Sequence, residues 1–142
     1  MATCPECEFD EIDTEDYDEG DTLSCPECGK SLVVMGSDEV VESVLAAAET
    51  AGEPQWPMPI PEAMTERVHS SKVADLAQHD WIRWGGGLFA AAFLREFTAG
   101  TPWAHLDIAG PGFNSGSAYG HVTPGGTGVA VATLVDYARS LA

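Results

Sequence analysis

Two copies of a Cys-Pro-Glu-Cys motif, Cys4–Cys7 and Cys25–Cys28, constrain the start of this chain more than any other feature. Each motif places two thiolates on one tight turn, and four thiolates complete the tetrahedral coordination that Zn²⁺ prefers. Metal binding is favoured over disulfides because the pattern is a doubled C-x-x-C in a chain with cytosolic character. We therefore expect one structural Zn²⁺ at a closed site formed by Cys4, Cys7, Cys25 and Cys28.

A zinc site of this kind implies a small β zinc ribbon over residues 1–35. So short a unit has little apolar core, and metal binding would contribute most of its folding free energy. Residues 36–54 are predicted to form a helical linker. Its apolar stripe has two open interpretations, packing on its own chain or docking on another subunit.

The charge of the chain is concentrated at its start. The formal net charge is −17, and residues 1–53 hold 16 acidic residues against one basic residue, Lys30. We expect no nucleic-acid binding, because phosphate contacts need a basic surface. The acidic segment is either a solubilising surface or a docking surface for a basic protein partner. With no apolar run of about 18 residues and no signal-peptide pattern, we expect no membrane span and a cytoplasmic location.

The remainder, residues 55–142, is predicted to be a partial α/β domain. Helical periodicity appears from residue 37, from Pro61, over 88–97 and from 129, and residues 30–35 and 103–108 alternate as strands do. We expect the strand at 103–108 to be covered by the helices at 88–97 and 129–141. Core positions and helix caps expected from the pattern are Trp56, Ile60, Phe89, Phe93 and Phe97, with caps at Ser37 and Thr127.

His105 and Asp107 lie two residues apart in the predicted strand, so their side chains project to one face. Two interpretations remain open for this pair. It is either an acid–base pair or a structural hydrogen bond at a strand end. No third ligand lies nearby in sequence, so no second metal site is predicted.

The first segment resembles the LysW-type amino-group carrier proteins of lysine biosynthesis. The resemblance rests on the two Cys-Pro-Glu-Cys motifs and on the acidic stretch Glu8–Asp21 between them. It implies a small acidic zinc ribbon whose surface docks basic biosynthetic enzymes.

Residues 55–142 resemble the last part of the catalytic domain of M17 leucyl aminopeptidases. The stretches that carry this resemblance are Trp56–Ile60, Val73–Leu76, Phe93–Phe97, Thr101–Gly110, Gly126–Val129 and Thr133–Val135. It implies that Ala109 and Gly110 belong to a segment lining the substrate pocket. The family's metal-binding motifs, of the type K-G-x-x-F-D-S-G-G and N-T-D-A-E-G-R, do not occur in this sequence.

Three functions follow from these patterns. The first is a non-catalytic scaffold or accessory subunit, a pseudo-aminopeptidase fused to a zinc ribbon that is no enzyme on its own. The second is a split subunit of an M17 metallo-aminopeptidase completed by a partner chain. The third is a LysW-like carrier or docking protein. All three imply a protein partner or self-association, because a partial domain exposes surfaces that a whole domain buries.

Overall fold

The computed structural model describes residues 32–82 and 84–142. The chain divides into two compact units, one formed by residues 33–107 and 130–142 and the other, among the described residues, by Leu32 and 108–129. The ribbon expected over residues 1–35 lies almost wholly outside the described residues. In the described part, no helix has the length and apolar character to cross a membrane.

The first unit is built on a three-stranded sheet of order β2-β1-β3. The strands are β1 Leu32–Gly36, β2 Gln55–Pro57 and β3 Ala104–Asp107, and β1 pairs antiparallel with β3 from Val33↔Asp107 to Gly36↔Ala104. On the other side of β1, the Met58 amide donates to the Val34 carbonyl at 2.9 Å. The strands predicted from alternation near residues 30–35 and 103–108 are therefore confirmed as β1 and β3.

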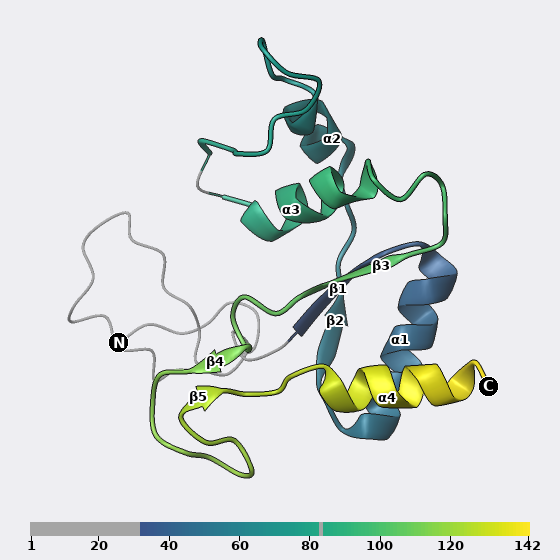
Figure 1. Ribbon diagram of the computed structural model, residues 1–142, viewed down its shortest axis with the longest axis vertical. Helices are drawn as coiled ribbons and strands as arrows, with labels where there is room; N and C mark the ends of the chain where they lie inside the picture. Colours follow the sequence, from purple (N-terminus) through teal and green to yellow (C-terminus); the bar gives the residue numbers. More distant parts are fainter. Residues whose placement is uncertain (1–31, 83) are drawn as a thin grey trace. The chain divides into compact units, whose positions relative to one another are not determined.

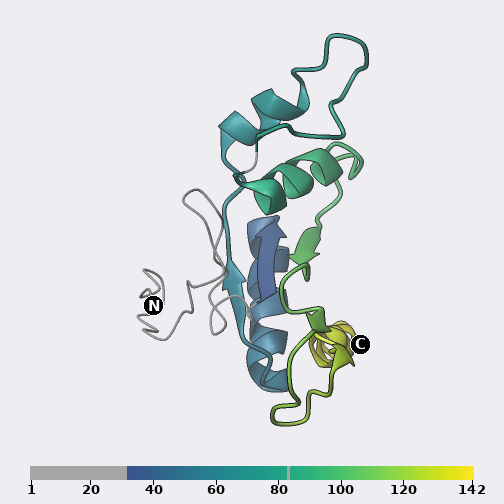
Figure 2. The ribbon, with the colours of Figure 1, turned by 90° about the vertical axis from the view of Figure 1, so that its left-hand side faces the viewer.

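Four helices surround this sheet in the same unit. They are α1 Asp38–Ala51, α2 Glu62–Val68, α3 Gly86–Arg95 and α4 Val131–Ser140. Helix α1 contacts β2 and β3, and α4 crosses α1, while α2 and α3 pack together at the other end of the sheet (Figures 1 and 2). The expectation that α4 covers β3 is wrong, because α4 makes its main contact with α1.

Apolar burial differs from the sequence expectation at two aromatic residues. Phe89 is buried with Val68 and Ala92, and Ile60 and Phe93 pack against this cluster as expected. Trp56 and Phe97, however, are 56% and 65% exposed. The expectation that both are core residues is therefore wrong, although the Phe97 ring still meets the Phe93 ring at a centroid distance of 5.1 Å.

The apolar stripe of α4 is not buried against α1. Its side chains are exposed: Val131, Leu134, Val135, Ala138 and Leu141. The face toward α1 instead carries the fully buried Thr133. A helix of a globular protein normally buries its apolar stripe. Helix α4 instead exposes this stripe and buries the polar Thr133.

Residues 108–129 form the described part of the second unit. A short strand β4, Phe113–Asn114, pairs antiparallel with β5, Gly125–Gly126. The Thr127 hydroxyl donates to the Pro111 carbonyl at 2.6 Å and holds the two ends of this segment together. The glycine-rich stretch is therefore an ordered loop.

The start of α4 is capped by a side chain far away in sequence. The Glu53 carboxylate accepts hydrogen bonds from the Ala130 and Thr133 amides at 3.1 and 2.9 Å. The Thr133 hydroxyl donates to the same carboxylate at 2.6 Å and accepts from the Gln55 amide at 2.8 Å. The helix begins too late for Thr127 to cap it, so that expectation is wrong.

The prediction that the Ser37 side chain caps α1 is also wrong. Ser37 occupies the N-cap position of α1 but makes no side-chain cap bond. Its hydroxyl instead accepts a hydrogen bond from the Trp103 amide at 3.2 Å, while its own amide donates to the Trp103 carbonyl at 2.9 Å. Ser37 therefore ties the end of β1 to the residue before β3.

Replacement of Glu53 tests the long-range cap. We expect Glu53→Gln to lower the free energy of unfolding by about 1–2 kcal/mol, because a charge-assisted cap at a helix N-terminus is lost. Urea unfolding of the full chain, followed by circular dichroism, measures this. Glu49→Gln, at an exposed position of α1, is the matched control. Equal midpoints for the two variants would contradict the assignment.

Candidate functional site

The four cysteines expected to bind Zn²⁺ lie outside the described residues. Among residues 32–82 and 84–142, no three His, Cys, Asp or Glu side chains group together as metal ligands. This part of the chain therefore offers no metal centre of its own. The expectation of a single zinc site at Cys4, Cys7, Cys25 and Cys28 stays a prediction.

The predicted pair His105 and Asp107 lies on β3, opposite Met35 and Val33 respectively. Their spacing places both side chains on one face of the strand. The His105 Nε2 atom is buried and has no hydrogen-bond partner among the described residues. Ala109 and Gly110, also predicted as site residues, follow in a turn that belongs to the second unit.

The Asp107 carboxylate lies against the first turn of α3. A methyl group built on Gly87 would overlap Asp107 Oδ2, so only glycine permits this approach. A carboxylate at a helix N-terminus is favoured by the helix dipole and by the free amides of the first turn. Gly87 therefore accommodates a carboxylate of the same chain at the start of α3.

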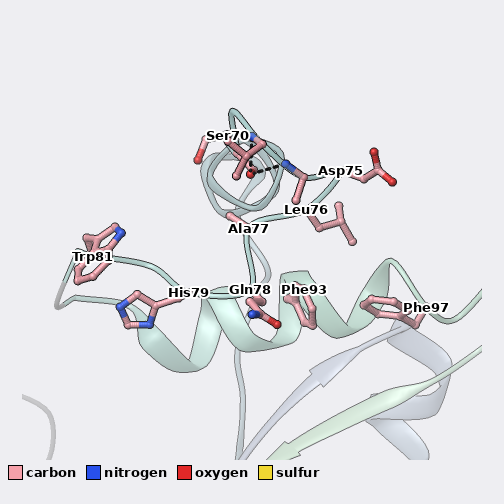
Figure 3. A pocket seen from close by; sticks show the side chains of 12 residues that line it. Ser70, Asp75, Leu76, Ala77, Gln78, His79, Trp81, Phe93 and Phe97 are labelled. Carbon is pink, nitrogen blue, oxygen red and sulfur yellow. Dashed lines mark hydrogen bonds between the residues drawn. The ribbon is translucent and has the colours of Figure 1, made fainter.

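A hollow on the first unit lies between residues 70–81 and α3. It is an open groove of about 680 Å³. Trp81 and His79 stand at one end and Phe97 at the other, with Phe93 between them (Figure 3). We call this surface the loop face and define it by six lining residues: Val73, Leu76, His79, Trp81, Phe93 and Phe97.

Apolar side chains project from the loop face to an unusual extent. Val73 is 96% exposed and Trp81 is 93% exposed. Among the described residues, the Trp81 ring contacts the His79 ring in a T-shaped arrangement at a centroid distance of 4.7 Å. Large exposed apolar patches on soluble proteins mark interaction sites, and tryptophan is enriched among the residues that dominate binding energy.

Polar contacts hold the loop that carries these side chains. Arg67 of α2 forms an ion pair with Asp80, whose other carboxylate oxygen accepts from the Ile82 amide at 2.9 Å. The Ala77 amide donates to the Val68 carbonyl at 2.7 Å. Near the start of the loop, the Ser71 hydroxyl accepts from the Ala74 amide at 3.0 Å. The exposed side chains therefore stand on an anchored backbone.

Sequence reasoning placed no functional residue in this loop. Apolar residues such as Val73 and Trp81 are ordinarily read as core, and the stretch has no helical or strand period between Val68 and Gly85. The signal in the sequence was that several apolar residues occur here without helical or strand periodicity. Only the fold reveals that the anchoring contacts leave these side chains outside.

Comparison with protein families gives one match over most of the chain. The catalytic domain of the cytosol aminopeptidase family, peptidase M17, matches residues 28–135. A probable cytosol aminopeptidase of Streptomyces coelicolor is 50% identical over 108 residues, which are 75% of this chain and 20% of the relative. One from Nocardia farcinica is 46% identical over 110 residues, 77% of this chain and 22% of the relative.

A solved structure matches the fold as well. The bottromycin maturation enzyme BotP, in a complex with Mn, is similar with a TM-score of 0.71 and 37% sequence identity, over 84% of this chain and 27% of that one. The chain thus spans about a fifth of the length of its curated relatives.

The anchoring of the loop face is testable. We expect Asp80→Ala to lower the free energy of unfolding by about 1–3 kcal/mol, because the partly buried Arg67 guanidinium loses its charged partner. Amide hydrogen exchange in residues 70–82 should become faster. Asp75→Ala, an exposed change in the same loop, should leave both quantities unchanged. Equal exchange in the two variants would show that the ion pair does not hold the loop.

Proposed function

The chain belongs to the cytosol aminopeptidase family, and from that premise we propose that it is one part of a divided aminopeptidase whose metal-binding part is a separate chain. In this proposal neither part hydrolyses peptides alone. The present chain completes the catalytic domain and the pocket wall, and the partner brings the metal ligands. The reaction is hydrolysis of an N-terminal peptide or amide bond.

The main support for this proposal is that the sequence match to the relatives is strong but covers only a small part of each relative. Identities of 46% and 50% hold over three quarters of this chain but about a fifth of each relative. The matched part lacks the family's metal-binding motifs. Without those motifs, this chain would contribute to catalysis only if another chain supplied the metal ligands.

The exposed apolar surfaces also support a missing partner. Trp56, Phe97 and the stripe of α4 are uncovered on different elements of the first unit. The non-catalytic scaffold that the sequence also suggested receives less support, because the relatives are named as aminopeptidases.

The metal ions of such an enzyme activate water and polarise the scissile carbonyl. The residues of this chain would shape and orient the site around that chemistry. Following the family resemblance, Ala109 and Gly110 would line the substrate pocket. Asp107 would keep α3 docked on β3.

Complementation tests the proposal. A version of the Streptomyces coelicolor relative from which the segment matching this chain has been deleted would be mixed with the present chain and Mn²⁺. We expect hydrolysis of leucine p-nitroanilide to appear only in the mixture. Each part alone, and the mixture with a chelator, are the controls. Activity of the present chain alone, or none in the mixture, would contradict a divided enzyme.

We also propose that Cys4, Cys7, Cys25 and Cys28 hold one structural Zn²⁺. The support is the doubled C-x-x-C spacing, which supplies four thiolates and leaves no open coordination position. Native mass spectrometry of the full chain should find one zinc per chain. Cys25→Ser with Cys28→Ser should abolish it and leave the folded unit around β1 and β3 intact. A zinc-free chain with two disulfides would refute the site.

A further inference from the structure

We propose that the loop face is the surface on which the metal-bearing partner chain docks, with Val73 and Trp81 as its central contacts. The inference rests on the proposed function, because it names where the two parts of the divided enzyme meet. Its occupant is one macromolecule of stated chemistry, the complementary part of an aminopeptidase catalytic domain.

The exposed apolar area on this face is large for the number of residues. Val73 and Trp81 are 96% and 93% exposed, and Phe97 is 65% exposed. Exposed apolar side chains that gather around one groove are uncommon on soluble monomers and mark interaction sites. The groove between them gives an apolar side chain of the partner a place to insert (Figure 3).

The anchored loop makes this surface suited to binding. The ion pair of Arg67 with Asp80 and the hydrogen bond from Ala77 to Val68 fix the backbone on both sides of the groove. Little conformational entropy would therefore be lost when a partner binds. Among the described residues, the ring contact of Trp81 is with His79, so its exposed ring adds little to the packing of the described unit.

The size of the face favours a large complementary chain over a second copy of this one. A stable pair of proteins buries about 800 Å² and about 20–30 residues on each partner, so the six residues of the loop face would form only part of such an interface. The remaining uncovered apolar residues lie elsewhere, on β2 and along α4. A two-fold dimer joins one self-complementary patch. A partner supplying the rest of a catalytic domain would cover several patches at once.

The rim of the groove indicates the chemistry of the partner surface. Ser70, Asp75 and Gln78 border the apolar floor. An aliphatic or aromatic side chain ringed by hydrogen-bond donors would match this arrangement. Specificity would come from the rim and affinity from the inserted side chain.

Binding measurements on the same truncated relative test the inference. The dissociation constant of the full chain for the truncated Streptomyces coelicolor protein would be measured by calorimetry, together with restored hydrolysis. We expect Val73→Asp and Trp81→Ser each to weaken binding about tenfold or more. Glu42→Gln changes the charge by one unit at an exposed position of α1 and should change binding less than about twofold.

Because Val73 and Trp81 are almost fully exposed, both variants should keep the melting temperature of the free chain, which separates lost docking from lost folding. Restored activity with undiminished binding by both variants would overturn the loop face and leave the divided enzyme standing. No binding by the unaltered chain would overturn both. A homodimer of the unaltered chain that Val73→Asp dissociates would assign the face to a second copy instead.

Discussion

The antiparallel pairing of β1 with β3 is the contact on which the rest of the first unit depends. It joins residues near 35 to residues near 105, and its close end requires Gly36. A methyl group there would lie 2.8 Å from the Ala104 Cα and would overlap the Trp103 carbonyl oxygen. Ser37 adds a backbone and a side-chain bond to Trp103. With this pairing in place, α1 and α3 can both pack on β3.

The same unit uses its polar side chains for long-range connections. Glu53 holds the start of α4, and Arg67 holds the loop at Asp80. Because polar groups fix these segments, apolar residues on them remain available at the surface. The unit is therefore ordered and yet leaves Trp81, Phe97 and the stripe of α4 uncovered. This combination is expected of one part of a larger domain, whose core is shared with another part.

Much of the fold could be predicted from sequence. The period of apolar residues indicated all four helices and the strands β1 and β3, since these patterns follow from backbone geometry alone. Gly52 ends α1 in the left-handed conformation, as a glycine at that position indicates. The direction of the α4 stripe could not be predicted. Periodicity identifies an apolar face, but it does not say whether the same chain covers it.

The candidate site, too, could be predicted only in part from the sequence. The alternation in residues 103–108 placed His105 and Asp107 on one face, but only the fold brought Asp107 to Gly87, because α3 meets β3 through tertiary packing. The loop face gave no local pattern, since its exposure depends on contacts from Arg67 and Val68 to residues beyond the helix.

The sequence by itself determined the helices, the strands and the family resemblance of residues 55–142, because these depend on short-range spacing and motif order. The tertiary structure alone decided that Glu53 caps α4 and that Val73 and Trp81 stand in water. Both facts depend on which distant segments meet, and no local pattern encodes that.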